Sequence, residues 1–199
     1  MPPSFAITEL LIVLTAAFCF LRLRKHYPFA AIGISLFGLA ALIGVYRFLS
    51  GEVDQLASIH KYISQAGALL GLILITIEII LAQALLAQKP AIKKSGYVII
   101  ITSLFFVNIF QSYILPAYII SSLASIILAY RLAGPNKGKK LFYIFLMSIM
   151  PLNLILVRNS ELLNQVISWH IFHILVAAWI YGIYYMLDTT KPRINSLPK

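Results

Sequence analysis

The sequence predicts an all-α integral membrane protein, a bundle of about seven transmembrane helices, and three observations support this fold class. Of the 199 residues, 61% are hydrophobic and 11% are charged, whereas a soluble domain of this size needs more charge on its surface. The apolar residues form runs of about 20, the length that crosses a bilayer. The basic residues, which give a net charge of +10, lie in short loops, so membrane orientation and anionic lipid headgroups explain them better than nucleic acid.

Seven spans are predicted within a single transmembrane domain over residues 1–187, followed by a short cytoplasmic tail over 188–199. They lie near residues 5–22, 28–49, 55–87, 96–112, 115–132, 140–157 and 163–187. The first run has no basic region before it and is followed by "RLRKH", which indicates a stop-transfer segment rather than a cleavable signal peptide. The second, third, sixth and seventh are apolar runs separated by short polar or basic loops.

The fourth and fifth spans need a separate argument because no polar loop divides them. Residues 96–132 form one apolar run, which is too long for a single crossing. Both flanks are basic, "KPAIKK" and "YRLAGPNKGKK", so an even number of crossings is expected. Pro116 disfavours helix at Leu115, which predicts a tight reversal within "QSYILPAY".

The basic loops predict the orientation. Only Arg47, Lys61 and Arg158 fall towards the side of the membrane that holds the N-terminus. The other basic residues fall on the opposite side: Arg22, Arg24, Lys25, Lys89, Lys93, Lys94, Arg131, Lys137, Lys139, Lys140, Lys191, Arg193 and Lys199. By the positive-inside rule the N-terminus is outside and the C-terminus cytoplasmic, as in a multi-pass protein of a bacterial inner (plasma) membrane.

Polar residues inside the predicted spans gather at one depth. Counted at about 1.5 Å per residue, those of the outer half are Glu9, Arg47, His60, Ser64, Asn108, Gln111, Asn153, His170 and His173. In the inner half Glu78 stands almost alone. Ionisable side chains in a membrane usually face a bundle interior or a cavity, so the shared depth predicts one cavity near the outer face. Glu9 and Arg47 are expected to pair across it.

Three histidines are candidate metal ligands. His170 and His173 in "SWHIFHIL" are three residues apart, so they lie on nearly the same helix face. His60 reaches the same depth from the third span. Three imidazoles with a water form a catalytic zinc site, whose open position generates a nucleophilic hydroxide. The alternative is that each histidine is a core residue hydrogen-bonded to a carbonyl of a neighbouring helix.

Three further residues at this depth are catalytic candidates. Glu9 is a candidate general base or orienting group, and Arg47 a candidate for stabilising a developing oxyanion. Ser64 lies one turn after His60. With Gly67 and Gly71 it also forms a small-residue stripe, which is typical of close helix packing.

These features resemble those of the membrane hydrolase superfamily that includes alkaline ceramidases and progestin/adiponectin receptors. The resemblance implies seven helices and a zinc ion held by one histidine of an early helix and two of the last, here His60, His170 and His173. The final pair is spaced HxxH in this chain, whereas that superfamily has HxxxH. The stretches "TELL", "GVYRF" and "HKYIS" also look like signatures of a bacterial seven-span family.

Three functions therefore follow as expectations. The first is a zinc-dependent intramembrane hydrolase that acts on a lipid amide or ester from the surrounding membrane lipids. The second is a b-type haem protein with His60 and either His170 or His173 as axial ligands. The third is a small-molecule transporter or ligand-binding receptor whose histidines are proton-linked, although no internal repeat of the kind common in transporters is visible. The sequence does not determine the oligomeric state.

Overall fold

The computed structural model describes residues 4–86 and 114–190, and every regular element in these ranges is helical. Six of its helical segments are long and apolar enough to cross a membrane, as expected for a multi-pass membrane protein. The elements are α1 (Phe5–Leu23), α2 (Pro28–Leu49), α3 (Ala57–Leu86), α5 (Ile114–Leu132), α6 (Lys137–Leu152), the π-helical turn η2 (Asn153–Arg158) and α7 (Gln165–Asp188). The spans predicted near these ranges are confirmed as helices. The predicted span 96–112, with Asn108 and Gln111, lies outside the described residues.

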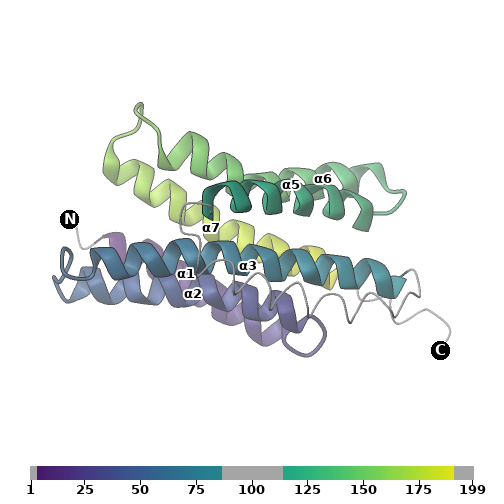
Figure 1. Ribbon diagram of the computed structural model, residues 1–199, viewed down its shortest axis with the longest axis horizontal. Helices are drawn as coiled ribbons and strands as arrows, with labels where there is room; N and C mark the ends of the chain where they lie inside the picture. The colour runs from purple at the N-terminus through teal and green to yellow at the C-terminus, as the bar shows by residue number, and fades with distance from the viewer. Residues whose placement is uncertain (1–3, 87–113, 191–199) are drawn as a thin grey trace.

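The described helices follow one another around the bundle. Each contacts the next in the order α1, α2, α3, α5, α6 and α7, and α7 returns to contact α1. Figure 1 shows the start of α1 near the loops 50–56 and 159–164 at one end of the bundle. We call this the site end. The end of α7 and the turns 24–27 and 133–136 lie towards the opposite end.

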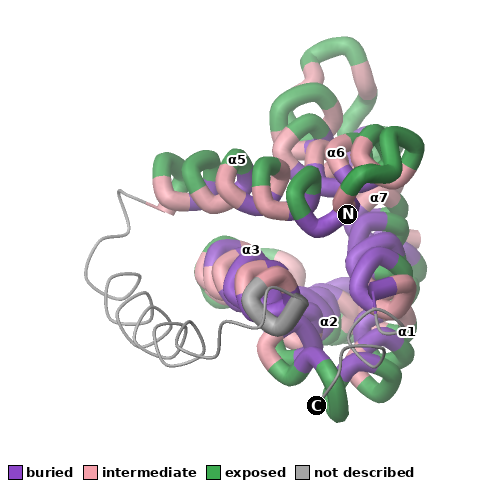
Figure 2. Tube along the Cα trace, turned by 90° about the vertical axis from the view of Figure 1, so that its right-hand side faces the viewer, coloured by how far each residue is buried: buried purple, intermediate pink, exposed green. Residues whose placement is uncertain are grey.

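Apolar side chains cover both the inside and the outside of the bundle. In Figure 2 the buried residues lie mainly where helices face one another, and exposed residues lie on the outward sides. Many of these exposed residues are large and apolar, such as Leu14, Leu39 and Leu141. Water would disfavour such a surface, whereas lipid tails are as apolar as leucine. The surface therefore agrees with the membrane assignment made from composition.

Small residues let α2 and α3 approach closely. A Cβ atom added to Gly33 would lie 2.6 Å from the carbonyl oxygen of Gly71, and one added to Gly71 would lie 2.7 Å from that of Gly33. These distances are too short for any side chain, so the two backbones are in direct contact. The small-residue stripe that includes Gly71 thus serves the close packing expected of it.

The Glu78 side chain of α3 caps the first turn of α2. Its Oε2 atom accepts hydrogen bonds from the backbone N–H groups of Phe29 at 2.8 Å and Ala30 at 3.2 Å. The N-terminus of a helix has unpaired N–H groups and a partial positive charge. The residue before α2, Tyr27, supplies no side-chain cap. The carboxylate that stood nearly alone in the sequence is therefore a tertiary helix cap.

Replacing Glu78 with alanine is expected to lower the free energy of unfolding by about 1–2 kcal/mol, the usual cost of losing a helix cap and its charge. Thermal unfolding in detergent, followed by intrinsic fluorescence, measures the change. Glu161→Ala is the control because Glu161 is exposed in the loop before α7. Equal unfolding temperatures for the two variants would show that the cap contributes nothing to stability.

Candidate functional site

Two histidines converge on one buried carboxylate near the site end. Glu9 of α1 is 2% exposed, and its Oε1 atom lies 3.3 Å from Nε2 of His173 on α7 and 3.6 Å from Nε2 of His60 on α3. Gly44 of α2 leaves the space for this carboxylate, since a Cβ atom there would lie 2.5 Å from Oε1. Four helices thus build the group Glu9, His60 and His173, which we call the Glu–His cluster.

The contacts of His173 favour an extra proton in this cluster. Its Nδ1 lies 2.7 Å from the carbonyl oxygen of Trp169, and because a carbonyl only accepts, Nδ1–H donates. A neutral imidazole carries one N–H, so Nε2 would then point a lone pair at the Glu9 carboxylate. Within the described residues, Oε1 of Glu9 forms no hydrogen bond of standard geometry. A proton on either Nε2 or the carboxyl group removes this repulsion.

His60 has two neighbours on one nitrogen. Its Nε2 lies 3.4 Å from Oγ of Ser64, one turn further along α3, as well as near Glu9. In a Ser–His–carboxylate triad the serine and the carboxylate occupy different ring nitrogens. The contacts of Ser64 are therefore those of a polar neighbour of His60, and they do not form such a triad.

His170 is directed away from the cluster. Its ring nitrogens lie 3.4 Å from Oγ of Ser4 and 3.3 Å from Oγ1 of Thr8, both at the start of the chain. Residues three apart on a helix differ by about 60° in direction, and here His173 is buried whereas His170 is half-buried. The structure brings together His60 and His173 and leaves His170 apart.

The geometry gives no support to the predicted cofactors. Among residues 4–86 and 114–190, no group of three His, Cys, Asp or Glu side chains is placed to hold a metal ion. Zinc held by His60, His170 and His173 therefore stays a prediction. A haem between His60 and His173 would have to displace the Glu9 carboxylate, and it too stays a prediction.

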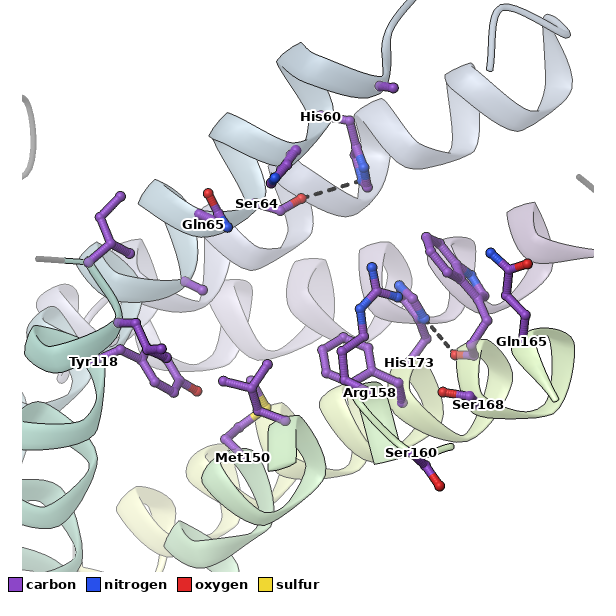
Figure 3. A pocket seen from close by; sticks show the side chains of 18 of the residues that line it. His60, Ser64, Gln65, Tyr118, Met150, Arg158, Ser160, Gln165, Ser168 and His173 are labelled. Carbon is purple, nitrogen blue, oxygen red and sulfur yellow. Dashed lines mark hydrogen bonds between the residues drawn. The ribbon is translucent and has the colours of Figure 1, made fainter. Parts of the chain in front are cut away.

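A pocket of about 900 Å³ lies beside the cluster, between α3, the start of α5, the end of α6 with η2, and α7. In Figure 3, His60 and Ser64 on α3 face Arg158 and His173 across it. Arg47 and Lys61 also line the pocket, and none of the lining residues that the structure describes is Asp or Glu. Its volume lies within the range of about 300–1,000 Å³ that is typical of small-molecule sites. The arrangement can hold a ligand next to groups that bind protons.

Glu9 and Arg47 were expected to form an ion pair across the cavity, but Arg47 does not pair with Glu9. Its Nε–H donates to the carbonyl oxygen of Val53 at 2.6 Å, and its guanidinium lies 5.3 Å from the centre of the Phe48 ring. Among the described residues, the ion contacts of Glu9 are with His60 and His173. The reason is geometric, because the two imidazoles occupy the carboxylate while Arg47 reaches the loop after α2.

Two residues that line the pocket were not among the candidates. Arg158 places its guanidinium 4.9 Å from the Trp169 ring centre and 5.5 Å from that of Phe172. Trp169 stacks on His173 with ring centres 4.4 Å apart and planes 25° apart. The sequence offered one signal, because Arg158 and Trp169 flank the loop that joins the sixth and seventh spans.

Comparison with protein-family models, curated proteins and solved structures finds no match to this chain. The resemblance to the membrane hydrolase superfamily thus stays a prediction, and function has to be argued from the site itself.

Proposed function

We propose that this protein binds a small molecule in the pocket and couples binding to the proton of the Glu–His cluster, as a membrane transporter or receptor does. One observation carries the proposal: two imidazoles in the wall of a ligand-sized pocket face one buried carboxylate. Histidine titrates near neutral pH, so a ligand that changes the field at the cluster changes its proton occupancy. With the N-terminus outside, as the loop charges predict, the pocket belongs to the outer half of the membrane.

Charged groups from several helices determine how ligand binding changes the proton occupancy of the Glu–His cluster. Glu9 favours protonated imidazoles, whereas nearby cations disfavour them. The groups at the pocket or cluster are Glu9 on α1, Arg47 on α2, His60 and Lys61 on α3, Arg158 on η2 and His173 on α7. Adding a negative ligand among them stabilises the protonated cluster, and linkage requires that protonation strengthen the binding of that ligand to the same extent.

A pocket-filling substitution tests the proposal. Ser64 lines the pocket, whereas Ile59 on the same helix is 51% exposed and does not line it. Native mass spectrometry of the purified protein is expected to show a bound small molecule in the wild type and in Ile59→Trp. In Ser64→Trp its occupancy is expected to fall by about tenfold, equivalent to about 1.4 kcal/mol of lost binding.

The same samples separate the competing functions. Occupancy that depends on pH in the wild type supports the proton coupling. A wild type without any bound molecule, or equal occupancy in the two tryptophan variants, contradicts the proposal. Stoichiometric zinc would favour the lipid hydrolase instead, and a Soret band would favour the haem protein.

A further inference from the structure

We infer that the ligand is an anionic amphiphile, a carboxylate or phosphate head group on an apolar chain. This inference rests on the proposed function and adds the chemical class of the ligand. It follows from the way in which the walls of the pocket divide into a cationic side and an apolar side.

The cations of the pocket have no carboxylate within ion-pair distance, and Glu9 acts on Arg158 only from further away. Arg47, Lys61 and Arg158 line the pocket, and among its described lining residues there is no carboxylate. Across the described part of the chain, the ion pairs within 4.0 Å are those of Glu9 with His60 and His173, so they leave these three cations out. An anionic head group would supply the missing negative charge.

The need for a negative charge is greatest at Arg47, because this side chain is only 7% exposed. Its Nε–H is directed to the carbonyl oxygen of Val53, and a guanidinium has further N–H donors in a planar fork that suits carboxylate or phosphate oxygens. A buried cation without a counter-charge is costly. A neutral or cationic ligand would leave this cost in place, whereas an anion would remove it.

Arg158 is held in position by two aromatic rings. Its guanidinium lies over the rings of Trp169 and Phe172, and stacking of this kind orients the plane of the guanidinium. Figure 3 shows Arg158 beside His173 and across the cavity from His60. The head group is therefore expected next to the Glu–His cluster, where its charge acts on the cluster proton.

The other side of the pocket suits an alkyl chain. Its apolar lining comes from the start of α5 and from α6 and η2: Ile114, Leu115, Met150 and Leu154. In Figure 3, Tyr118 lies at the far side of the cavity from His173, and Met150 lies between Tyr118 and Arg158. Burial of an apolar chain contributes roughly 0.8 kcal/mol per methylene group. Head and chain thus bind at different sides of one cavity.

The test compares probes that share a chain and differ in the head. Dodecyl phosphate, dodecanoate, dodecanol and dodecyltrimethylammonium are titrated into protein in phosphatidylcholine nanodiscs by calorimetry, with empty nanodiscs subtracted. Inorganic phosphate and acetate test whether the chain is needed. Both anionic amphiphiles are expected to bind at least about tenfold more tightly than dodecanol, since a hydrogen bond to a charged group contributes about 1.5–3 kcal/mol.

Three variants make the outcomes distinguishable. Arg158→Gln is expected to weaken the anionic amphiphiles about tenfold and to leave dodecanol unchanged. Arg131→Gln, on an exposed arginine at the end of α5, is the matched control and is expected to change nothing. Ser64→Trp is expected to weaken every amphiphile that binds, by about tenfold as for the ligand above.

Each of the other possible results contradicts one specific part of the inference. Equal binding of all four amphiphiles, weakened in Ser64→Trp, preserves the binding pocket and refutes the anionic head. Free phosphate or acetate binding as tightly as the amphiphiles refutes the apolar chain. Binding that Ser64→Trp does not alter refutes binding of these probes in the pocket, and no binding at all refutes the anionic amphiphile as the ligand. In both cases the native mass spectrometry described above decides separately whether the proposed function holds.

Discussion

In Glu9→Gln, the proton held by the Glu–His cluster is expected to be lost, and with it the pH dependence of ligand binding. Nδ1–H of His173 donates to the carbonyl oxygen of Trp169, so in the wild type the second proton lies on Nε2 or on Glu9. A glutamine amide supplies its own N–H to a neutral Nε2 and needs no extra proton. The wild type is therefore expected to show one of two signals: an imidazolium in histidine ¹⁵N NMR, or a carboxylic acid C=O stretch in the infrared. Glu9→Gln is expected to show neither.

Two further variants separate the charge of Glu9 from its packing. Glu9→Ala leaves both Nε2 atoms facing an empty space, which is expected to cost about 1–3 kcal/mol of stability for unsatisfied buried groups, whereas Glu9→Gln is expected to stay close to the wild type. Glu161→Gln alters an exposed carboxylate and is expected to leave both spectra unchanged. A wild type with an ionised Glu9 and neutral histidines would refute the shared proton.

A comparable loss of stability is expected from Gly71→Ala. The new Cβ atom would lie 2.6 Å from Cε2 of Phe37 and 2.7 Å from the carbonyl oxygen of Gly33. The aromatic ring can turn, but the Gly33 backbone belongs to the middle of α2 and yields only if the helices separate. Overpacking of this kind costs about 1–3 kcal/mol, and thermal unfolding in detergent measures it.

Gly67→Ala is the matched control on the same helix. There the nearest atom to the new Cβ is the carbonyl oxygen of Leu36 at 3.3 Å, which requires a shift of only a few tenths of an ångström. We expect its unfolding temperature to stay near that of the wild type. If Gly67→Ala destabilised the protein as much as Gly71→Ala, direct contact of the α2 and α3 backbones would not be the reason for this glycine.

The positions of the helices were largely predictable from the sequence. The predicted span 28–49 coincides with α2 (Pro28–Leu49), and the predicted span 163–187 differs from α7 (Gln165–Asp188) by two residues at its start and one at its end. In a bilayer, backbone groups must be satisfied within the segment and the apolar length must match the membrane. Hydrophobic run length therefore carries most of the information on where a helix lies.

The site was predictable in composition but not in arrangement. Shared depth drew attention to Glu9, His60 and His173, which do meet. It also grouped His170 with them, although that side chain contacts Ser4 and Thr8. Depth follows from the position along a helix, whereas direction depends on how each helix is rotated against its neighbours.

The amino-acid sequence alone determined two properties: that the protein is a helical membrane protein, and at which depth its polar groups lie. Both properties depend on distance along a single helix. Tertiary structure decided the rest. It turned Glu78 into a cap for α2, gave Glu9 two imidazoles in place of Arg47, and placed Arg158 in the wall of the pocket. The physical reason is that each of these contacts joins separate helices, and the packing of small and large side chains between helices determines which faces meet.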